Sequence, residues 1–131
     1  TLSDYRGKQN VVLVFFPMAF TGICTGELCE IRDNRSTFVS DDVQVLGISC
    51  DTSASQKAFA VQENLDYPLL SDFWPHGEVS KKYGAWFEDR GFSLRGTFII
   101  DKEGILRWSV VNSPGDARNT DEYKKALAEL A

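Results

Sequence analysis

The stretch Asn10-Val-Val-Leu-Val-Phe-Phe16-Pro17-Met-Ala-Phe-Thr21-Gly-Ile-Cys24 joins an unbroken apolar run to a short loop and a helix start. Continuous β-branched and aromatic residues without alternation are typical of a strand that is buried on both faces. Pro17 ends that strand, Thr21 can cap a helix, and residues 21–38 are expected to be helical. The stretch therefore predicts a strand–loop–helix unit at the sheet edge where α/β proteins bind ligands.

Strands and helices alternate along the rest of the chain. Strands are expected at 43–49, 68–71, 94–100 and 105–111, and helices at 57–64, 77–83 and 121–130. Alternation of this kind favours parallel crossovers, and the turn at 102–104 adds an antiparallel pair. We predict an α/β protein of thioredoxin-like fold, with a mixed central sheet covered by helices on both faces, forming a single domain over 1–131.

The composition excludes several classes of partner. The 131 residues carry a net charge of −5 with no basic block, which argues against nucleic acids and membrane surfaces. The longest apolar run is far shorter than the roughly 20 residues of a membrane-spanning helix. Three cysteines are too few, and odd in number, for a secreted disulfide framework, so a reducing, cytoplasmic location is expected.

Cys24 lies in or near the first turn of the predicted helix. Unpaired backbone N–H groups at a helix start act as about half a positive charge, which favours the nucleophilic thiolate. Thr21, three residues earlier, places a hydroxyl one turn from the sulfur. This spacing predicts a reactive cysteine, with a buried inert thiol as the alternative.

Glu27 follows Cys24 by three residues on the same helix face, where its carboxylate would disfavour a thiolate. We therefore expect a basic partner from elsewhere in the chain. Arg95, at the start of an apolar strand, is the candidate, because a guanidinium can bind a carboxylate bidentately and still direct an N–H at the sulfur. Taken alone, Arg95 would be a solvated charge at a strand end.

The string Pro17-x-x-x-Thr21-x-x-Cys24 resembles the peroxidatic motif of the peroxiredoxins. Arg95-Gly-Thr-Phe-Ile-Ile-Asp101 is similar to the arginine-bearing strand of that family, and the similarity extends through Ser71-Asp-Phe-Trp-Pro-His-Gly77. These flanks look most like the AhpE-type subgroup. The amino-terminal strand pair usual in the family is absent, so we expect a chain trimmed at its amino terminus.

The resemblance implies a thiol-dependent peroxidase that reduces hydrogen peroxide and organic hydroperoxides. Cys24 would attack one peroxide oxygen and become a sulfenic acid, while Thr21 would hydrogen-bond the peroxide and Arg95 would polarise it. Pro17 would shield the thiolate from water, and Glu27 would hold the arginine. The family implies no metal, haem or flavin, and a thioredoxin- or glutaredoxin-like protein as the reductant.

Cys29 follows Cys24 by five residues, a spacing that resembles the Q-type subgroup (bacterioferritin comigratory protein), whose later cysteine resolves the sulfenic acid. In an intact helix this offset separates the two Cα atoms by roughly 8–9 Å, whereas a disulfide needs less than about 7 Å. A Cys24–Cys29 bond would therefore require the first turns to unwind, and Gly26 weakens the helix by about 1 kcal/mol relative to Ala. An inert Cys29 packed in the helix is the alternative.

Other residues carry structural readings. Cys50 closes a buried strand and is expected in the core. Trp74 and His76 lie in a proline-containing loop, as a packed aromatic and an exposed histidine. The cysteines and His76 lack a zinc-binding spacing, so no metal site is predicted.

Two other functions compete with the peroxidase reading. A thiol–disulfide exchange module is disfavoured because the chain has no Cys-x-x-Cys. A peroxide-sensing module would share the first step and lack efficient turnover. The resemblance also implies a homodimer or larger homo-oligomer, with Phe20, Trp86 and Phe87 as candidate contacts.

Overall fold

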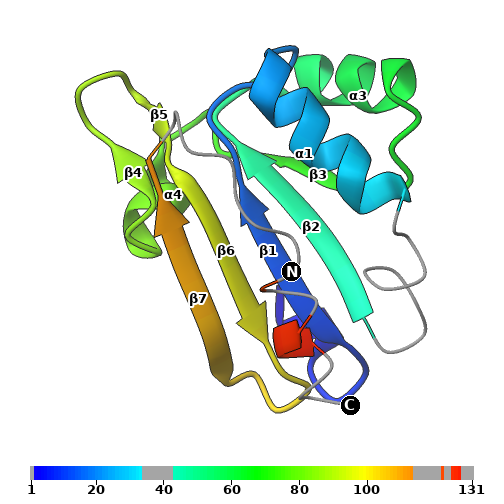
Figure 1. Cartoon of the computed structure of the whole chain (residues 1–131). Helices are drawn as coiled ribbons and strands as arrows, with labels where there is room; N and C mark the ends of the chain where they lie inside the picture. The colour runs from blue at the N-terminus through cyan, green and yellow to red at the C-terminus, as the bar shows by residue number, and fades with distance from the viewer. Residues whose placement is uncertain (1, 34–42, 114–121, 123–124, 128–131) are drawn as a thin grey trace.

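The structure is a computed structural model that describes residues 2–33, 43–113, 122 and 125–127 (Figure 1). Its strands are β1 (Asn10–Phe15), β2 (Val43–Ser49), β3 (Leu69–Ser71), β4 (Trp86–Phe87), β5 (Phe92–Ser93), β6 (Arg95–Ile100) and β7 (Leu106–Asn112). Its helices are α1 (Gly22–Asp33), α3 (Ser53–Gln62), α4 (Glu78–Lys82) and the 3-10 helix η1 (Leu2–Tyr5).

The main sheet has the strand order β3-β2-β1-β6-β7. The central strand β1 runs parallel to β2 and antiparallel to β6, with Val14 opposite both Gly47 and Thr97. Every residue of β1 and β6 is buried, as expected for the interior of a sheet covered on both faces. Because β6 is antiparallel to β1, the carboxyl ends of β1 and β2 and the start of β6 meet at one edge of the sheet (Figure 1).

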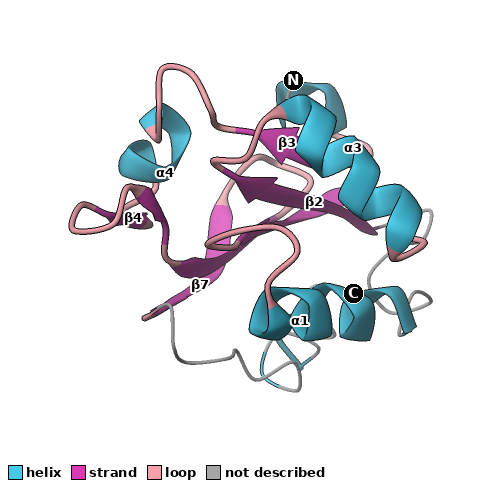
Figure 2. Cartoon of the chain, turned by 90° about the horizontal axis from the view of Figure 1, so that it is seen from above, coloured by secondary structure: helices cyan, strands magenta, loops and turns pink. Residues whose placement is uncertain are grey.

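Helices cover the sheet from both sides, with α1 on one face and α4 on the other (Figure 2). Alternate side chains of β1 divide between two apolar clusters. Val12 and Val14 pack with Leu28 and Ile31 of α1, whereas Leu13 packs in the second cluster, with Tyr83 partly buried against it. The core thus consists of two layers, and α1 closes one of them at the sheet edge just described.

The mixed α/β architecture is confirmed, with differences at element ends. Helix α3 begins at Ser53 rather than Lys57, because Thr52 caps it by accepting a hydrogen bond from the Ser55 N–H at 3.2 Å. The turn at 102–104 joins β6 to β7 as expected, and Gly104 there has a φ of 83°. Residues 122 and 125–127 are helical, whereas the rest of the helix expected at 121–130 lies outside the described residues, as does 34–38.

The β4–β5 hairpin and η1 were not predicted. Each hairpin strand has only two residues, Trp86–Phe87 and Phe92–Ser93, which is too short for a strand period to show in the sequence.

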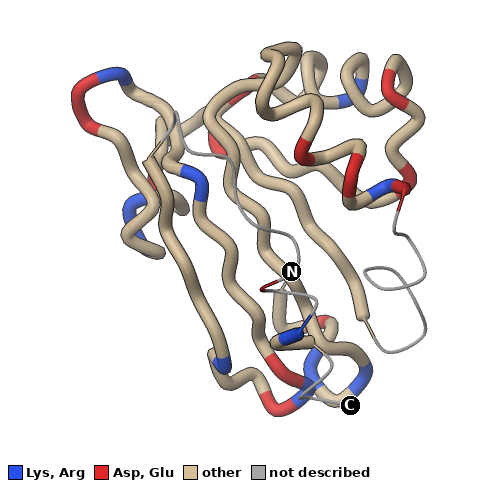
Figure 3. The backbone as a smooth tube through the Cα atoms, in the orientation of Figure 1, with Lys and Arg blue, Asp and Glu red and all other residues tan. Residues whose placement is uncertain are grey.

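Charged residues of the described chain lie mainly in loops and helices, and few lie along the strands (Figure 3). Lys and Arg are spread among Asp and Glu in this view rather than gathered on one face. Within the described residues, no helix is both long enough and apolar enough to cross a membrane.

Candidate active site

The edge where β1 ends carries the loop 16–21, which leads into α1. Pro17 and Ala19 are buried in this loop, whereas Met18 and Phe20 are exposed. Phe20 adopts a left-handed backbone conformation with a φ of 65°, which is uncommon for a bulky residue. Its ring packs on Phe59 of α3, with 5.1 Å between the centroids. The loop is therefore tightly shaped before the helix begins.

Cys24 is the third residue of α1 and its thiol is free. The residue has no exposed surface and belongs to the apolar cluster under α1. The exposed residues Thr21, Gly22 and Ile23 immediately precede it. The sulfur thus lies one layer beneath the surface in the first turn, where the helix dipole favours an anion.

A buried cation lies against this sulfur. Nη1 of Arg95 lies 3.3 Å from Sγ of Cys24 and 2.5 Å from Oε1 of Glu27. The Arg95 and Glu27 side chains are 4% and 6% exposed, so water screens this ion pair little. The basic partner that the sequence predicted for Glu27 is present, and one nitrogen serves both the carboxylate and the sulfur.

Thr21 directly precedes α1. Its carbonyl accepts the N–H of Thr25 at 2.9 Å, and its hydroxyl donates to the Met18 carbonyl at 2.7 Å. Among the described residues, no backbone N–H of α1 donates to this hydroxyl, so the side chain does not act as the helix cap that the sequence suggested. Thr21 is exposed and lies three positions before Cys24, and its hydroxyl oxygen can accept a hydrogen bond from an incoming hydroxyl.

Cys29 is half-buried and faces α3. Its sulfur lies 3.6 Å from Oε2 of Glu63. Burial raises the pKa of the Cys29 thiol, Arg32 lowers it, and the Glu63 carboxylate raises it further. The two cysteines of α1 therefore have different partners, because Cys24 contacts Arg95 on β6 and Cys29 contacts Glu63, the residue that ends α3.

Cys50 lies in the core at the end of β2, as expected. Its sulfur is 3.7 Å from the Ser93 hydroxyl, which lies 2.7 Å from the Ser80 hydroxyl. Burial raises the pKa of the Cys50 thiol, although hydrogen bonding to Ser93 lowers it. A thiol in this environment is protonated at neutral pH and acts as a packing group.

The prediction that Trp74 is a packed aromatic is wrong, because this side chain is 83% exposed. The packing position is occupied by Trp86, whose ring contacts His76 at 5.6 Å between centroids and lies against Gly77. His76 is exposed, as expected, and its two ring nitrogens lie 3.1 Å and 2.7 Å from the carbonyl oxygens of Phe73 and Gly91.

Asp51 is a site residue that the sequence reading missed. The cap of the following helix is its neighbour, Thr52. Instead, Oδ2 of Asp51 accepts the N–H of Ala19, 2.8 Å away in the loop before Cys24. The available signal was its position two residues after the end of β2, at the same edge as the end of β1.

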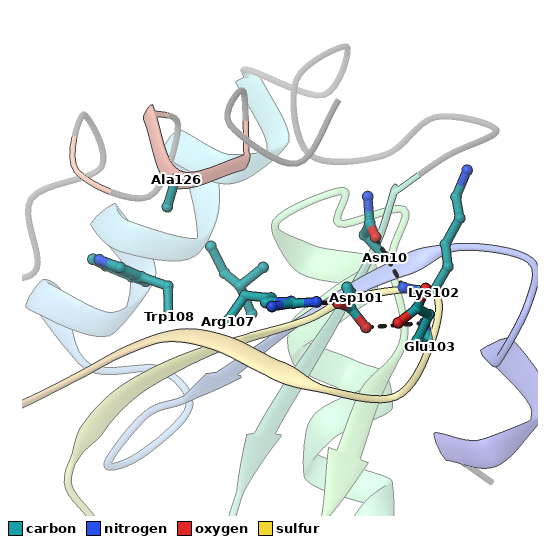
Figure 4. Close-up of a pocket in the computed structure, with 8 residues that line it drawn as sticks. Asn10, Asp101, Lys102, Glu103, Arg107, Trp108 and Ala126 are labelled. Atoms are coloured by element: carbon teal, nitrogen blue, oxygen red, sulfur yellow. Dashed lines mark hydrogen bonds and ion pairs between the residues drawn. The ribbon is translucent and has the colours of Figure 1, made fainter.

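A pocket lined mainly by polar residues lies at the opposite end of the sheet. It has a volume of about 560 Å³ and is lined by Asn10, Asp101, Lys102 and Arg107 among others (Figure 4). Asn10 starts β1 and Asp101 follows β6, so this pocket is separated from Cys24 by the length of both strands. Among the described side chains, no group of three or more His, Cys, Asp or Glu could hold a metal ion.

Comparison with known proteins places this arrangement in a family. The AhpC/TSA family matches residues 1–109. Alkyl hydroperoxide reductase E of Mycobacterium tuberculosis (strain ATCC 25618 / H37Rv) is 48% identical over 130 residues, which are 99% of this chain and 85% of that protein. The chloroplastic 2-Cys peroxiredoxin BAS1 of Spinacia oleracea is 39% identical over 98% of this chain and 51% of its own length.

Solved structures agree with this assignment. The crystal structure of reduced Plasmodium vivax 2-Cys peroxiredoxin superposes with a TM-score of 0.85 at 30% identity, covering 97% of this chain and 68% of that one. Enterococcus faecalis AhpC gives a TM-score of 0.87 at 27% identity, covering 97% and 77%. The chain therefore belongs to the AhpC/TSA family and is a peroxiredoxin, a thiol-dependent peroxidase with a thioredoxin-like fold.

Proposed function

We propose that Cys24 is the peroxidatic cysteine and that hydrogen peroxide and organic hydroperoxides are its substrates. The observation that carries this proposal is the contact between a cysteine in the first turn of α1 and the buried guanidinium of Arg95, at 3.3 Å. A nearby cation and a helix start both favour the thiolate, which is the form that attacks an O–O bond. Cys29 instead lies against the Glu63 carboxylate, and Cys50 lies against the Ser93 hydroxyl in the core.

The reaction follows from the groups around the sulfur. The Cys24 thiolate attacks one peroxide oxygen, so that an S–O bond forms and the O–O bond breaks. The other oxygen leaves with the electron pair, takes up a proton, and departs as water or an alcohol. The Arg95 guanidinium stabilises the charge that develops on the leaving oxygen, and Thr21 accepts a hydrogen bond from the peroxide hydroxyl.

Two further residues support this chemistry. Glu27 holds Arg95 through the 2.5 Å contact to Nη1, which fixes the guanidinium beside the sulfur. Pro17 is buried in the loop before Thr21, lacks a backbone N–H, and limits the approach of water to the thiolate.

Regeneration consumes two thiols. One thiol condenses with the sulfenic acid of Cys24 and releases water. The resulting disulfide is then reduced by thiol–disulfide exchange, which takes both thiols of a dithiol reductant when the first thiol is Cys29. We assign this reduction to a thioredoxin- or glutaredoxin-like protein. Cys29 can supply the first thiol only if the early turns of α1 unwind. In the folded helix, its sulfur contacts Glu63, whereas the sulfur of Cys24 contacts Arg95.

Peroxide consumption by single-cysteine variants tests the proposal. Cys24→Ser should abolish peroxide reduction with dithiothreitol as the reductant, whereas Cys50→Ser should retain it. Repeated turnover of peroxide per chain distinguishes a peroxidase from a sensing module, which would be oxidised once. A Cys24→Ser variant that still consumes peroxide would show that another group is the nucleophile.

We further propose that the chain forms a homodimer through the edge that carries the active site. Met18, Phe20 and Ile23 are 44%, 50% and 43% exposed and form an apolar rim around the start of α1. The sequence also suggested Trp86 and Phe87, which are half-buried in β4. Sedimentation velocity should give a dimer or larger species, which Phe20→Asp should dissociate.

A reducing location such as the cytoplasm fits this function. All three cysteines are free, and the proposed cycle needs a supply of reduced thiol.

A further inference from the structure

We infer that Asp51 is a positioning residue for the peroxidase reaction, whose carboxylate fixes the loop that presents Thr21 to the peroxide. This inference rests on the proposed function of Cys24 and Thr21, and it adds a residue that touches neither the sulfur nor the substrate. Asp51 follows β2, whereas the loop follows β1, and these two strands are parallel neighbours. Their carboxyl ends therefore lie side by side.

The first contact joins Asp51 to the middle of the loop. The N–H of Ala19 donates to Oδ2 of Asp51 at 2.8 Å, across 32 positions of sequence. Ala19 is 4% exposed, so water cannot readily replace the carboxylate as the acceptor of this N–H. Removing the acceptor would leave a buried donor unpaired.

The same peptide unit also holds Thr21. The peptide bond between Met18 and Ala19 contributes its N–H to Asp51 and its carbonyl to the Thr21 hydroxyl, which donates to it at 2.7 Å. A peptide unit is planar, so fixing the N–H fixes the direction of the carbonyl. Asp51 therefore determines, through one rigid plane, where the Thr21 hydroxyl points.

Asp51 is held in turn from beneath the loop. The Ser49 hydroxyl donates to the same Oδ2 at 2.5 Å, and Nε2 of Gln56 donates to the Ser49 oxygen at 2.7 Å. The Gln56 amide is anchored by a second bond, from Nε2 to the Leu70 carbonyl at 2.9 Å. Ser49 and Gln56 are 0% and 1% exposed, which strengthens these hydrogen bonds and keeps them from exchanging with water.

The donor and the acceptor of each hydrogen bond in this network can be assigned. An ionised carboxylate only accepts, so the Ser49 hydrogen points at Asp51 and the Ser49 oxygen accepts from Gln56. The chain therefore runs from Gln56 through Ser49 to Asp51, and Asp51 also accepts the Ala19 N–H. Because both bonds end on one oxygen, an amide carbonyl at position 51 could accept both of them.

This geometry separates the two halves of the active site. Arg95 on β6 contacts Cys24 and is held by Glu27 of α1, and neither contact involves Asp51. Loss of the Asp51 acceptor should therefore disturb the Thr21 hydroxyl while leaving the sulfur beside its guanidinium. Reaction with peroxide, which uses Thr21, should slow, whereas alkylation of the thiolate, which does not, should remain.

The experiment compares two reactions of the reduced full chain: oxidation of Cys24 by hydrogen peroxide and alkylation of Cys24 by iodoacetamide. In Asp51→Ala we expect the peroxide rate constant to fall by about ten- to a hundredfold, with alkylation changed by less than about threefold. Asp51→Asn should restore the peroxide rate to within about threefold of the parent, because its carbonyl oxygen accepts both bonds. Hydrogen exchange at the Ala19 amide should accelerate in Asp51→Ala only.

Thr52→Ala is the matched control. It removes the cap of α3 at the adjacent position and lowers thermal stability. The Thr52 hydroxyl hydrogen-bonds Ser55 of α3 rather than the loop, so both rates should stay at the parental values. If Asp51→Ala does not fold, Asp51→Glu provides the same test, since one extra methylene displaces the acceptor while keeping the charge, and the peroxide rate should fall selectively.

Three results would overturn the inference: equal changes in the two rates in Asp51→Ala, an unchanged peroxide rate in that variant, or no rescue by Asp51→Asn. Each of these results counts against the inference only when the parent chain reacts with peroxide at Cys24. If Cys24→Ser reacts with peroxide as fast as the parent, the proposed function fails instead, so the two failures are distinguishable.

Discussion

At the residue scale, the chemistry depends on how charge is balanced around the Cys24 sulfur. A thiolate next to the Glu27 carboxylate would place two negative charges in a space that excludes water. Arg95 contacts both, and the guanidinium makes the group net −1 with the thiolate rather than −2. Glu27 therefore serves the thiolate indirectly, since it keeps in place the cation that would otherwise favour solvent.

The Arg95–Glu27 pair makes a prediction about stability. Arg95→Ala should destabilise the fold by about 3–5 kcal/mol, because it leaves the Glu27 carboxylate buried without its cation. The double variant Glu27→Leu/Arg95→Met removes both charges and should recover most of that loss. Urea unfolding measures the free energies. Losses that simply add in the double variant would show that the two residues do not interact in the fold.

Thr21 makes a prediction about rate. Thr21→Val keeps the side-chain shape without the hydroxyl, and the peroxide rate constant should fall by about ten- to a thousandfold. Thr21→Ser keeps the hydroxyl and should react close to the parental rate. Stopped-flow oxidation under pseudo-first-order peroxide measures both constants. Equal rates for the Val and Ser variants would exclude a role for the hydroxyl.

At the scale of the element, α1 must satisfy two requirements. Its first turn holds Cys24 against Arg95, and formation of an internal disulfide with Cys29 would require that turn to open. Gly26 lies between the cysteines, and a methyl group at this position would meet no atom within 4 Å. Gly26 is therefore not required for close packing, and its main effect is to lower the helix propensity between the two cysteines.

Gly26→Ala tests the unwinding directly. The substitution should stabilise the folded chain by about 1 kcal/mol and slow Cys24–Cys29 disulfide formation about fivefold, because the helix must open before the sulfurs meet. Intact-mass analysis after one equivalent of peroxide follows the disulfide. Val61→Ala is the control, because it raises the helix propensity of α3 rather than of α1, at a position that is 76% exposed. It should leave the rate unchanged. A folded chain that keeps Cys29 free beside an oxidised Cys24 would argue against internal resolution.

The environment of Cys29 predicts its pH dependence. Burial raises the pKa of this thiol, so at neutral pH it is protonated and should react with iodoacetamide more slowly than Cys24, with the rate rising as the pH increases. In urea the burial is lost, the pKa falls towards about 8.5, and Cys29 should react faster at neutral pH than in the folded chain. Peptide mapping of timed samples measures each site. Equal rates for Cys29 in folded and unfolded chains would contradict this.

At the scale of the whole molecule, the sequence was sufficient to predict the long strands of the main sheet and the presence of a basic partner for Glu27. The apolar runs of β1, β2 and β6 span the described strands to within one residue, because strands buried on both faces need continuous apolar residues. A basic partner for Glu27 was predicted from a charge argument, since a carboxylate three residues from a reactive cysteine needs a cation, and the resemblance to the peroxiredoxin strand supported Arg95 as that partner. These features follow from local pattern and from simple electrostatics.

What the sequence could not show depends on contacts between distant segments. Asp is a residue type that is common at helix caps, so the type of Asp51 does not indicate a loop contact. Only the parallel alignment of β1 with β2 brings it to Ala19. The exposure of Trp74 could not be read from its type, because Trp86 occupies the packing position through the unpredicted β4–β5 hairpin. The direction of the Thr21 hydroxyl likewise depends on the Met18 carbonyl rather than on the helix it precedes.

The central claim is that Cys24 is the residue whose sulfur attacks the peroxide. Its most direct test is to treat the reduced Cys29→Ser chain with one equivalent of hydrogen peroxide, trap sulfenic acid with dimedone, and map the adduct by peptide mass. We predict a single adduct on the peptide that contains Cys24, and none on that peptide when Cys24→Ser is introduced. An unmodified Cys24, or an adduct that forms first at Cys50, would contradict it.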